Sequence, residues 1–251
     1  MNIHWDATGY TRNFSFVHEY GSELIALLDK KEGSVLDLGC GNGALTQRLS
    51  QAGYSPVGMD ASPDLLAVAR SNYPDIHFFQ GDATDFRVDA PYDIVFSNAV
   101  FHWIERDKQD AMLRCVNAAL KPDGEFVFEF GGYGNNALTH AALAGASEKH
   151  GLVYQIPFYF PSIGEYASRL EAAGFKVTYA ILFDRPTPLS GEDGLYDWLK
   201  MFIKTPFADV DKAVKENIYR DTVEQLRYAF FRDGVWYSDY VRIRMKAVKI
   251  S

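Results

Sequence analysis

The stretch Val35-Leu36-Asp37-Leu38-Gly39-Cys40-Gly41-Asn42-Gly43 decides the fold. It begins as a short apolar strand and runs into a loop with a glycine at every second position, after which Leu45 and Leu49 resume helical spacing. Glycines let the backbone turn tightly and approach a ligand, and the start of the following helix offers unpaired N–H groups. The stretch therefore predicts a binding loop for a nucleotide-like cofactor.

The charge beside this loop indicates the kind of cofactor. A pyrophosphate-binding loop usually has the spacing G-x-G-x-x-G, whereas these glycines are Gly39, Gly41 and Gly43, and Asp37 precedes them. A carboxylate at that position would repel a diphosphate and attract an ammonium or sulfonium cation. The sign of the charge therefore favours a cationic cofactor.

Polar residues also follow the next predicted strands. Asp60 follows strand 56–59, where a carboxylate can accept hydrogen bonds from both hydroxyls of a ribose. Asp82 follows strand 76–80, where it could accept a hydrogen bond from the amino group of an adenine. Residues 96–103 end the next strand and would lie beside the reactive end of the cofactor. In an open parallel sheet these strand ends meet in one crevice, so we expect a single site.

The alternation of strands and helices continues along the chain. Such alternation predicts a parallel sheet with helices on both faces. We expect Pro186-Thr187-Pro188 to end the sixth strand and Asp233-Gly234 to form a turn before the last one. The predicted strands are 34–38, 56–59, 76–80, 93–97, 125–130, 175–183 and 236–249, and the predicted helices include 14–28, 63–73, 107–120, 137–150, 162–173 and two between 195 and 228.

Composition excludes several classes of protein. The 251 residues are 47% hydrophobic and 23% charged, which is typical of a compact globular chain and not of a disordered or fibrous one. The net charge of -8 disfavours nucleic acid as a partner. The basic residues Arg242, Arg244 and Lys246 alternate with apolar ones, which predicts a strand with one face exposed to water.

The two cysteines, Cys40 and Cys115, are far apart in sequence, and we interpret them as small buried hydrophobes in a reducing compartment. The first residues have neither a basic nor an apolar segment, and no apolar run reaches the roughly 18 to 20 residues that a membrane span requires. We therefore expect a cytoplasmic protein without a membrane partner, and we predict no metal site.

Five motifs, in order between about residues 33 and 131, resemble the class I S-adenosylmethionine-dependent methyltransferases. A looser resemblance, to the small-molecule branch that includes trans-aconitate and malonyl-carrier-protein methyltransferases, depends on Trp5-Asp6-Ala7 with Tyr10, on Phe101-His102-Trp103 and on a helical insertion before the last strand. The five motifs are residues 35–43, Gly58-Met59-Asp60, Gly81-Asp82-Ala83, Tyr92-Asp93-Ile94-Val95 and Leu120-Lys121-Pro122-Asp123-Gly124-Glu125.

The resemblance implies a fold and a cofactor. The fold would be a doubly wound, Rossmann-like α/β domain with a seven-stranded sheet, the last strand antiparallel, and with helical additions. Independently of the resemblance, we expect these additions to form a lid, because residues 1–20 and 186–234 are rich in aromatic side chains and Pro186-Thr187-Pro188 with Gly191 and Gly194 offers a hinge. The cofactor would be S-adenosylmethionine, with its methionine part near Asp37, Gly39 and Gly41, its ribose on Asp60, and its adenine on Asp82 and Ala83. The predicted cofactor-binding residues are Asp37, Gly39, Cys40, Gly41, Gly43, Asp60, Ala61, Asp82, Ala83 and, through its carbonyl, Asn98.

His102 and Tyr10 are the candidate catalytic residues. His102 is either a general base near the methyl acceptor or a packing residue and cofactor wall, and Tyr10 either closes over the site or packs. Asp60 could instead cap the following helix, and Asp82 could be an ordinary turn residue. Cys40 has no activating neighbour that would make it a nucleophile. If the acceptor is a carboxylate, the cations that could hold it are Arg12, Arg232 and Arg244.

The expected activity is methyl transfer to an oxygen of a small molecule, either a carboxylate or a hydroxyl, with a nitrogen or carbon acceptor as the less favoured alternative. The absence of Asn-Pro-Pro-Tyr or Asp-Pro-Pro-Tyr after the fourth strand, where Ser97-Asn98-Ala99-Val100 stands, argues against methylation of an amide or nucleobase. A nicotinamide-dependent oxidoreductase and a non-catalytic S-adenosylmethionine-binding module are the alternatives. We expect one domain over residues 1–251, with a core at about 33–131 and 160–251 and a helical insertion at about 186–234; the oligomeric state and the acceptor stay open.

Overall fold

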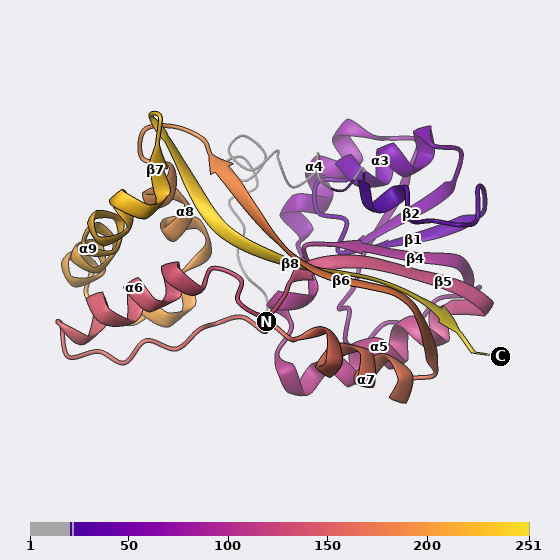
Figure 1. Ribbon diagram of the computed structural model, residues 1–251. Coiled ribbons are helices and arrows are strands. Elements are labelled where there is room, and N and C mark those ends of the chain that lie inside the picture. Colours follow the sequence, from indigo (N-terminus) through magenta and orange to yellow (C-terminus); the bar gives the residue numbers. More distant parts are fainter. Residues whose placement is uncertain (1–20, 22, 251) are drawn as a thin grey trace.

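The computed structural model describes residues 21 and 23–250, and its centre is an eight-stranded sheet (Figure 1). Seven strands follow the order β3-β2-β1-β4-β5-β8-β6, and the two-residue β7 pairs with β8 beside this path. Strands β1 to β5 are parallel, whereas β8 runs antiparallel to both β5 and β6, as predicted. The strands are β1 (Ser34–Leu38), β2 (Ser55–Asp60), β3 (His77–Gln80), β4 (Tyr92–Asn98), β5 (Leu120–Gly131), β6 (Phe175–Leu189), β7 (Phe231–Arg232) and β8 (Val235–Lys249).

Two of the helices, α4 and α7, begin at serine caps that the sequence offers. The side-chain oxygens of Ser62 and Ser162 accept the backbone N–H groups of Leu65 and Glu165, which satisfies donors that the first turn leaves unpaired. Within the described residues, none of the helices combines the length and apolar character that a membrane span needs. Most of the predicted helix 14–28 lies outside the described residues. The helices are α3 (Ala44–Gln51), α4 (Pro63–Asn72), α5 (Gln109–Ala119), α6 (Ala137–Glu148), α7 (Ile163–Ala172), α8 (Gly194–Phe202) and α9 (Lys212–Phe230).

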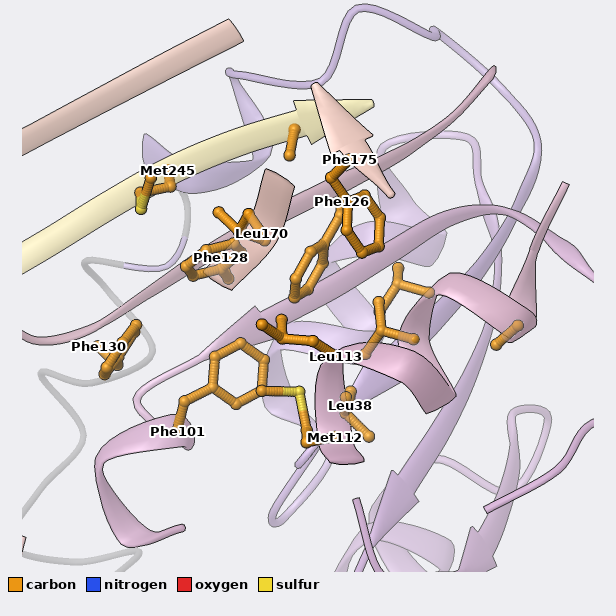
Figure 2. Close-up of a cluster of buried hydrophobic side chains, with 14 of the residues drawn as sticks. Leu38, Phe101, Met112, Leu113, Phe126, Phe128, Phe130, Leu170, Phe175 and Met245 are labelled. Carbon is orange, nitrogen blue, oxygen red and sulfur yellow. The ribbon is translucent and has the colours of Figure 1, made fainter. Parts of the chain in front are cut away.

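Hydrophobic clusters cover both faces of the sheet. On one face, α5 and α7 pack over a row of phenylalanine rings from β5, and Phe101 packs against the same row (Figure 2). On the other face, α3 and the segment around Leu24 cover Val35, Ile94 and Val127. Burying each such side chain contributes about 1.5–3 kcal/mol, so the alternation seen in the sequence becomes a sheet with two packed faces.

A second, helical lobe has a hydrophobic core of its own. Strands β6 and β8 continue past the end of β5 as a two-stranded ribbon, and its tip packs with α6, α8 and α9 (Figure 1). We call these three helices and the ribbon tip the helical lobe. Its core contains Trp198, Phe207, Tyr219 and Trp236, all nearly inaccessible to solvent. The predicted insertion 186–234 thus forms most of this lobe, together with α6.

The prediction that Pro186-Thr187-Pro188 ends the sixth strand is wrong. The three residues pair with Asp239, Ser238 and Tyr237 of β8, and β6 continues to Leu189. Because β6 is an edge strand and the prolines occupy alternate positions, both ring nitrogens can face the open edge, where no ladder hydrogen bond is lost.

The prediction of a water-exposed basic face on the last strand is also wrong. Arg242, Arg244 and Lys246 are 8%, 9% and 5% exposed. Arg244 donates from Nε to Glu129 Oε2 at 2.7 Å, and the ammonium of Lys246 lies 3.5 Å from Glu125 Oε2. Acidic side chains of the neighbouring strand therefore make the burial of Arg244 and Lys246 possible.

Candidate active site

A cleft of about 330 Å³ opens at the carboxyl ends of β1 to β4, between the elements where the strand order reverses. We call it the cofactor cleft. It is lined by the glycine loop after β1, by Asp60 after β2, by residues 80–84 after β3, and by Asn98 and its successors after β4. The four segments that the sequence placed in one crevice therefore do meet there.

The glycine loop turns sharply, and two of its glycines, Gly39 and Gly41, line the cofactor cleft. The N–H groups of Gly39 and Cys40 both donate to the carbonyl of Met59, at 2.7 and 3.0 Å. Gly41 has a φ of +55° and lines the cleft, and a Cβ there would meet no protein atom within 4 Å. A Cβ at Gly43 would instead lie 2.9 Å from the Phe78 ring. Gly41 is thus open to a ligand, whereas Gly43 allows close packing.

Asp60 lies in the wall of the cofactor cleft, with its carboxylate anchored by two backbone groups. Oδ2 accepts the N–H of Gly41 at 2.9 Å and Oδ1 accepts the N–H of Ser62 at 2.8 Å. Burial nevertheless raises the pKa of this carboxyl. Because Ser62 caps α4, the alternative role of Asp60 as that cap does not apply. Each carboxylate oxygen keeps further capacity to accept a ligand hydroxyl.

Asp82 is both a turn residue and part of the cofactor cleft. Its Oδ1 accepts the N–H and the hydroxyl of Thr84, each at 2.8 Å, and the backbone hydrogen bond is the main reason why its pKa is lowered. Ala61, Ala83 and Asn98 also line the cleft.

Other predicted cofactor residues point elsewhere. Asp37 is 2% exposed and accepts the Thr46 hydroxyl at 2.6 Å, and burial raises its pKa to about 7. The predicted attraction of a cation by Asp37 is therefore weakened by partial protonation near neutral pH. The Cys40 thiol is buried beside Gly58 and Phe78, and desolvation raises its pKa. Neither side chain lines the cofactor cleft, and Tyr10 lies outside the described residues.

A smaller pocket of about 50 Å³ adjoins the cofactor cleft, with which it shares Ala99 and Trp103. We call it the aromatic pocket. Its walls come from both lobes: the 3₁₀ turn Phe101–Trp103 after β4, the loop before α7, and α8. Its lining residues are Ala99, His102, Trp103, Asn135, Asn136, Phe158, Phe160, Trp198, Phe202, Tyr240 and Arg242.

His102 lies in this aromatic pocket with one ring nitrogen already used. Its Nδ1 faces the N–H of Gly131 at 3.3 Å, so Nδ1 is the acceptor and Nε2 carries the proton of the neutral ring. Desolvation among the surrounding rings, and then the nearby Arg242 guanidinium, lower the pKa of His102 well below its ordinary value. The neutral ring therefore keeps one hydrogen-bond donor, the Nε2–H.

Arg242 was not predicted as part of the site, whereas α8 belongs to the helical insertion that was expected to cover it. The alternation of basic and apolar residues around Arg242 predicts a strand, but it does not indicate which of these side chains the helical lobe covers. Of the cations predicted for an acceptor carboxylate, Arg244 is bound to Glu129, Arg232 is exposed and donates to the carbonyl of Ala229, and Arg12 lies outside the described residues.

Known proteins with similar sequences are methyltransferases. A family model described as a methyltransferase domain matches residues 35–124. An uncharacterized methyltransferase of Schizosaccharomyces pombe is 32% identical, over 98% of each chain. A malonyl-[acyl-carrier protein] O-methyltransferase of Halalkalibacterium halodurans is 31% identical over 52% of this chain and 53% of its own. A trans-aconitate 2-methyltransferase of Methylobacterium nodulans is 32% identical over 48% of this chain and 47% of its own.

Solved structures share the fold. A putative methyltransferase of Bacillus halodurans superimposes with a TM-score of 0.65 at 19% identity, covering 92% of this chain and 98% of that one. A phosphoethanolamine N-methyltransferase of Haemonchus contortus, solved with S-adenosylhomocysteine, gives a TM-score of 0.61 at 17% identity, covering 98% of this chain and 57% of that one.

The fold and the cofactor cleft define a Rossmann-like protein that binds a nucleoside cofactor at the switch point of its sheet. With these relatives, the chain belongs to the class I S-adenosylmethionine-dependent methyltransferases, and S-adenosylmethionine is its cofactor. This settles the choice against a nicotinamide-dependent oxidoreductase. The cleft fits such a cofactor, because Gly41 leaves the space that a Cβ would fill and Asp60 offers carboxylate oxygens beside it.

Proposed function

We propose that this methyltransferase modifies an oxygen atom of a small molecule, with a carboxylate as the preferred acceptor and a hydroxyl as the alternative. Two of the relatives, the malonyl-[acyl-carrier protein] O-methyltransferase and the trans-aconitate 2-methyltransferase, support this class by name. The aromatic pocket supports it by size, since it adjoins the cofactor cleft and has a volume of only about 50 Å³.

The residues of the cofactor cleft have separate roles in this proposal. Asp60 would bind the ribose hydroxyls, and residues 82–83 would face the adenine. Gly39, Gly41 and Asn98 would hold the methionine part. The bound cofactor supplies a methyl group on a sulfonium, which is a good leaving group. The protein therefore contributes mainly alignment of the acceptor and exclusion of water.

One observation carries the preference for a carboxylate: the described residues that line the aromatic pocket include no side chain suited to accept a proton. The Nδ1 atom of His102 is occupied by the Gly131 N–H, and the Tyr240 hydroxyl accepts the indole N–H of Trp198 at 2.5 Å. A hydroxyl acceptor must lose a proton during the reaction, whereas a carboxylate is ionised at neutral pH. In the transfer, a carboxylate oxygen forms the new C–O bond while the C–S bond breaks and its electron pair goes to sulfur.

The test uses S-adenosylmethionine labelled in the methyl group and a whole-cell extract, whose small molecules, proteins and nucleic acids are separated after the reaction. We expect a labelled product that mass spectrometry identifies as a methyl ester, and mild alkali should release its label as methanol. A label that resists alkali would instead indicate a methyl ether and therefore a hydroxyl acceptor. Turnover into protein or nucleic acid only, or cofactor binding without any turnover, would overturn the proposal; the second result would indicate a non-catalytic binding module.

A matched pair of glycine variants controls this experiment. Gly41 and Gly53 both have positive φ, and a Cβ at either position would meet no protein atom within 4 Å, but only Gly41 lines the cofactor cleft. The two substitutions therefore impose similar backbone strain of about 1–2 kcal/mol. We expect Gly41→Val to abolish the labelled product and Gly53→Val to retain it.

A further inference from the structure

The aromatic pocket is lined by one cation, Arg242 of β8, among the described residues. Arg242 begins the part of β8 that pairs with β5, opposite Gly131, and its guanidinium lies 4.2 Å from the centre of the Tyr240 ring. It is only 8% exposed, and it lines the aromatic pocket. Among the described residues, no carboxylate forms an ion pair with it.

The neighbouring arginines show that carboxylates are present but are used by others. Glu129 accepts Arg185 at 2.6 Å on Oε1 and Arg244 at 2.7 Å on Oε2. Glu23 Oε2 lies 3.0 Å from Arg244 and 3.5 Å from Arg185. Arg242 is therefore the member of this buried arginine row that lacks a carboxylate within the described part of the chain.

A nearly buried guanidinium is costly unless an anion and hydrogen-bond acceptors complete it. Its planar fork matches a carboxylate with two parallel hydrogen bonds. Aromatic walls keep water away, which strengthens the attraction between opposite charges. A ligand carboxylate that enters the pocket would therefore supply the negative charge and the hydrogen-bond acceptors for the Arg242 guanidinium.

The other polar side chains of the pocket are also arranged as donors. Asn135 Oδ1 accepts the N–H of Val241 at 3.0 Å, and Asn136 Oδ1 accepts the Ser238 hydroxyl at 2.9 Å. Both amide oxygens are therefore used within the protein, which leaves the NH₂ groups as the donors of these side chains. With the Nε2–H of His102, the pocket combines one cation with neutral donors, and no acidic side chain is among the described residues that line it.

We propose that Arg242 is the anchor for a carboxylate group of the methyl acceptor and determines specificity for small organic acids. This inference rests on the proposed function, because it places the acceptor in the aromatic pocket. The carbon skeleton of the acid packs among the rings that both lobes contribute, and the junction at Ala99 and Trp103 brings it to the cofactor cleft. Neutral analogues of the same shape are rejected because they leave Arg242 without an anion.

The test measures binding and needs no turnover. Straight-chain carboxylates from acetate to hexanoate, and the corresponding primary amides, are titrated into the protein loaded with S-adenosylhomocysteine. Fluorescence of Trp103 and Trp198, which line the pocket, reports occupancy alongside calorimetry. We expect at least one acid to bind about tenfold or more tightly than its amide, since a hydrogen bond to a charged group is stronger than one to a neutral group.

Two arginine variants distinguish a specific anchor from general charge. Arg242→Gln should remove the preference for acids while S-adenosylhomocysteine affinity stays within about twofold. Arg232→Gln, which removes an exposed guanidinium at the far tip of the ribbon, should keep the preference. A preference that survives Arg242→Gln, or the absence of any acid preference in the unmodified protein, would overturn the anchor.

The outcomes separate this inference from the proposed function. If the labelled product is the methyl ether of an uncharged alcohol, methyl transfer to oxygen stands and the carboxylate anchor falls. If acids bind through Arg242 but no extract yields a methylated small molecule, the anchor stands and the proposed activity falls.

Discussion

At the scale of single residues, Asp60 connects the glycine loop to the start of α4 through the N–H groups of Gly41 and Ser62. In the proposed role it also binds two ribose hydroxyls. Asp60→Ala should weaken S-adenosylhomocysteine binding by about 2–4 kcal/mol, as expected for the loss of charge-assisted hydrogen bonds. Calorimetry measures the affinity. Asp75→Ala, an exposed acid near the opposite end of β3, is the control and should bind normally.

Thermal denaturation of the Asp60 variant keeps this prediction interpretable, because its melting temperature reports whether the loop still folds. An affinity that stays within about twofold of the original in a folded variant would remove Asp60 from the ribose site.

Asp37 predicts a pH dependence of stability. Burial raises its pKa to about 7 from 3.8, so the folded state favours the protonated carboxyl. The stability that the protonated Asp37 carboxyl gives to the folded state is complete below pH 3.8 and is lost as the pH rises through about 7. Asp37→Asn keeps an oxygen for the Thr46 hydroxyl but does not ionise. The free energy of unfolding of this variant, relative to that of the unmodified protein, should therefore increase between pH 5 and pH 9 by about 3 kcal/mol, because the pKa of about 7 lies two units above pH 5 and each unit is worth about 1.4 kcal/mol.

Urea denaturation of both proteins without cofactor, at pH 5, 7 and 9, gives this difference directly. Other titrating groups are common to both chains and cancel in the comparison. Parallel pH profiles would mean that Asp37 is ionised in the folded protein, and its attraction for a cationic cofactor would then be restored.

At the scale of elements, β6 tests how prolines enter a strand. Thr187 lies between Pro186 and Pro188 and pairs with Ser238 of β8. We expect its N–H to face β8, whereas the ring nitrogens of the two prolines, which carry no hydrogen, face the open edge. Thr187→Pro should cost about 1–3 kcal/mol, because it leaves a buried acceptor unpaired. Pro188→Ala should change stability far less. Denaturant unfolding of the two variants compares them; equal losses would show that the ladder does not run through Thr187.

The sequence predicted the elements well wherever local signals sufficed. Periodicity and caps located β1 to β5, α4 and α7, because the glycine loop and the serine caps act within a few residues. It failed at Pro186 because the effect of a proline depends on which edge of the sheet it meets. It failed at Arg242 and Arg244 because burial of a basic row depends on Glu129 and on a second lobe, both distant in sequence.

The candidate site divides in the same way. The parts of the cofactor cleft near the loop, such as Gly41 and Asp60, follow from short motifs. The aromatic pocket brings together residues from 99 to 242 in sequence, and no local pattern indicates that Trp198 of α8 will share a pocket with His102. An acceptor site built between two lobes could therefore be predicted only as a region, namely the helical insertion.

At the scale of the whole molecule, the helical lobe bears on the predicted lid. The Phe202 ring of α8 lies 6.0 Å from the Trp103 ring, centre to centre, and Trp103 also lines the cofactor cleft. We predict that α8 gains protection from hydrogen exchange when S-adenosylhomocysteine binds, since closure would exclude water from the site. Residues 163–172 of α7, which lie against the sheet away from both cavities, are the internal control.

A lid requires protection that is gained on binding. Unchanged exchange in α8 with slower exchange in the glycine loop would mean that the helical lobe is a fixed wall of the aromatic pocket. The hinge could not be Pro186-Thr187-Pro188, which is held in the sheet, so motion would have to arise in the turn around Gly191, where φ is +85°.

The place of β8 between β5 and β6 has a consequence for biosynthesis. A ribosome makes β6 well before β8, yet β6 pairs with no other strand of the described sheet. Until β8 emerges, β5 has an open edge, and Glu129 lacks the Arg244 that later binds it. The nascent chain must therefore carry a half-built sheet with apolar surface exposed, which is the situation in which chaperones act. Translation of the final strand is then the event that joins the two lobes.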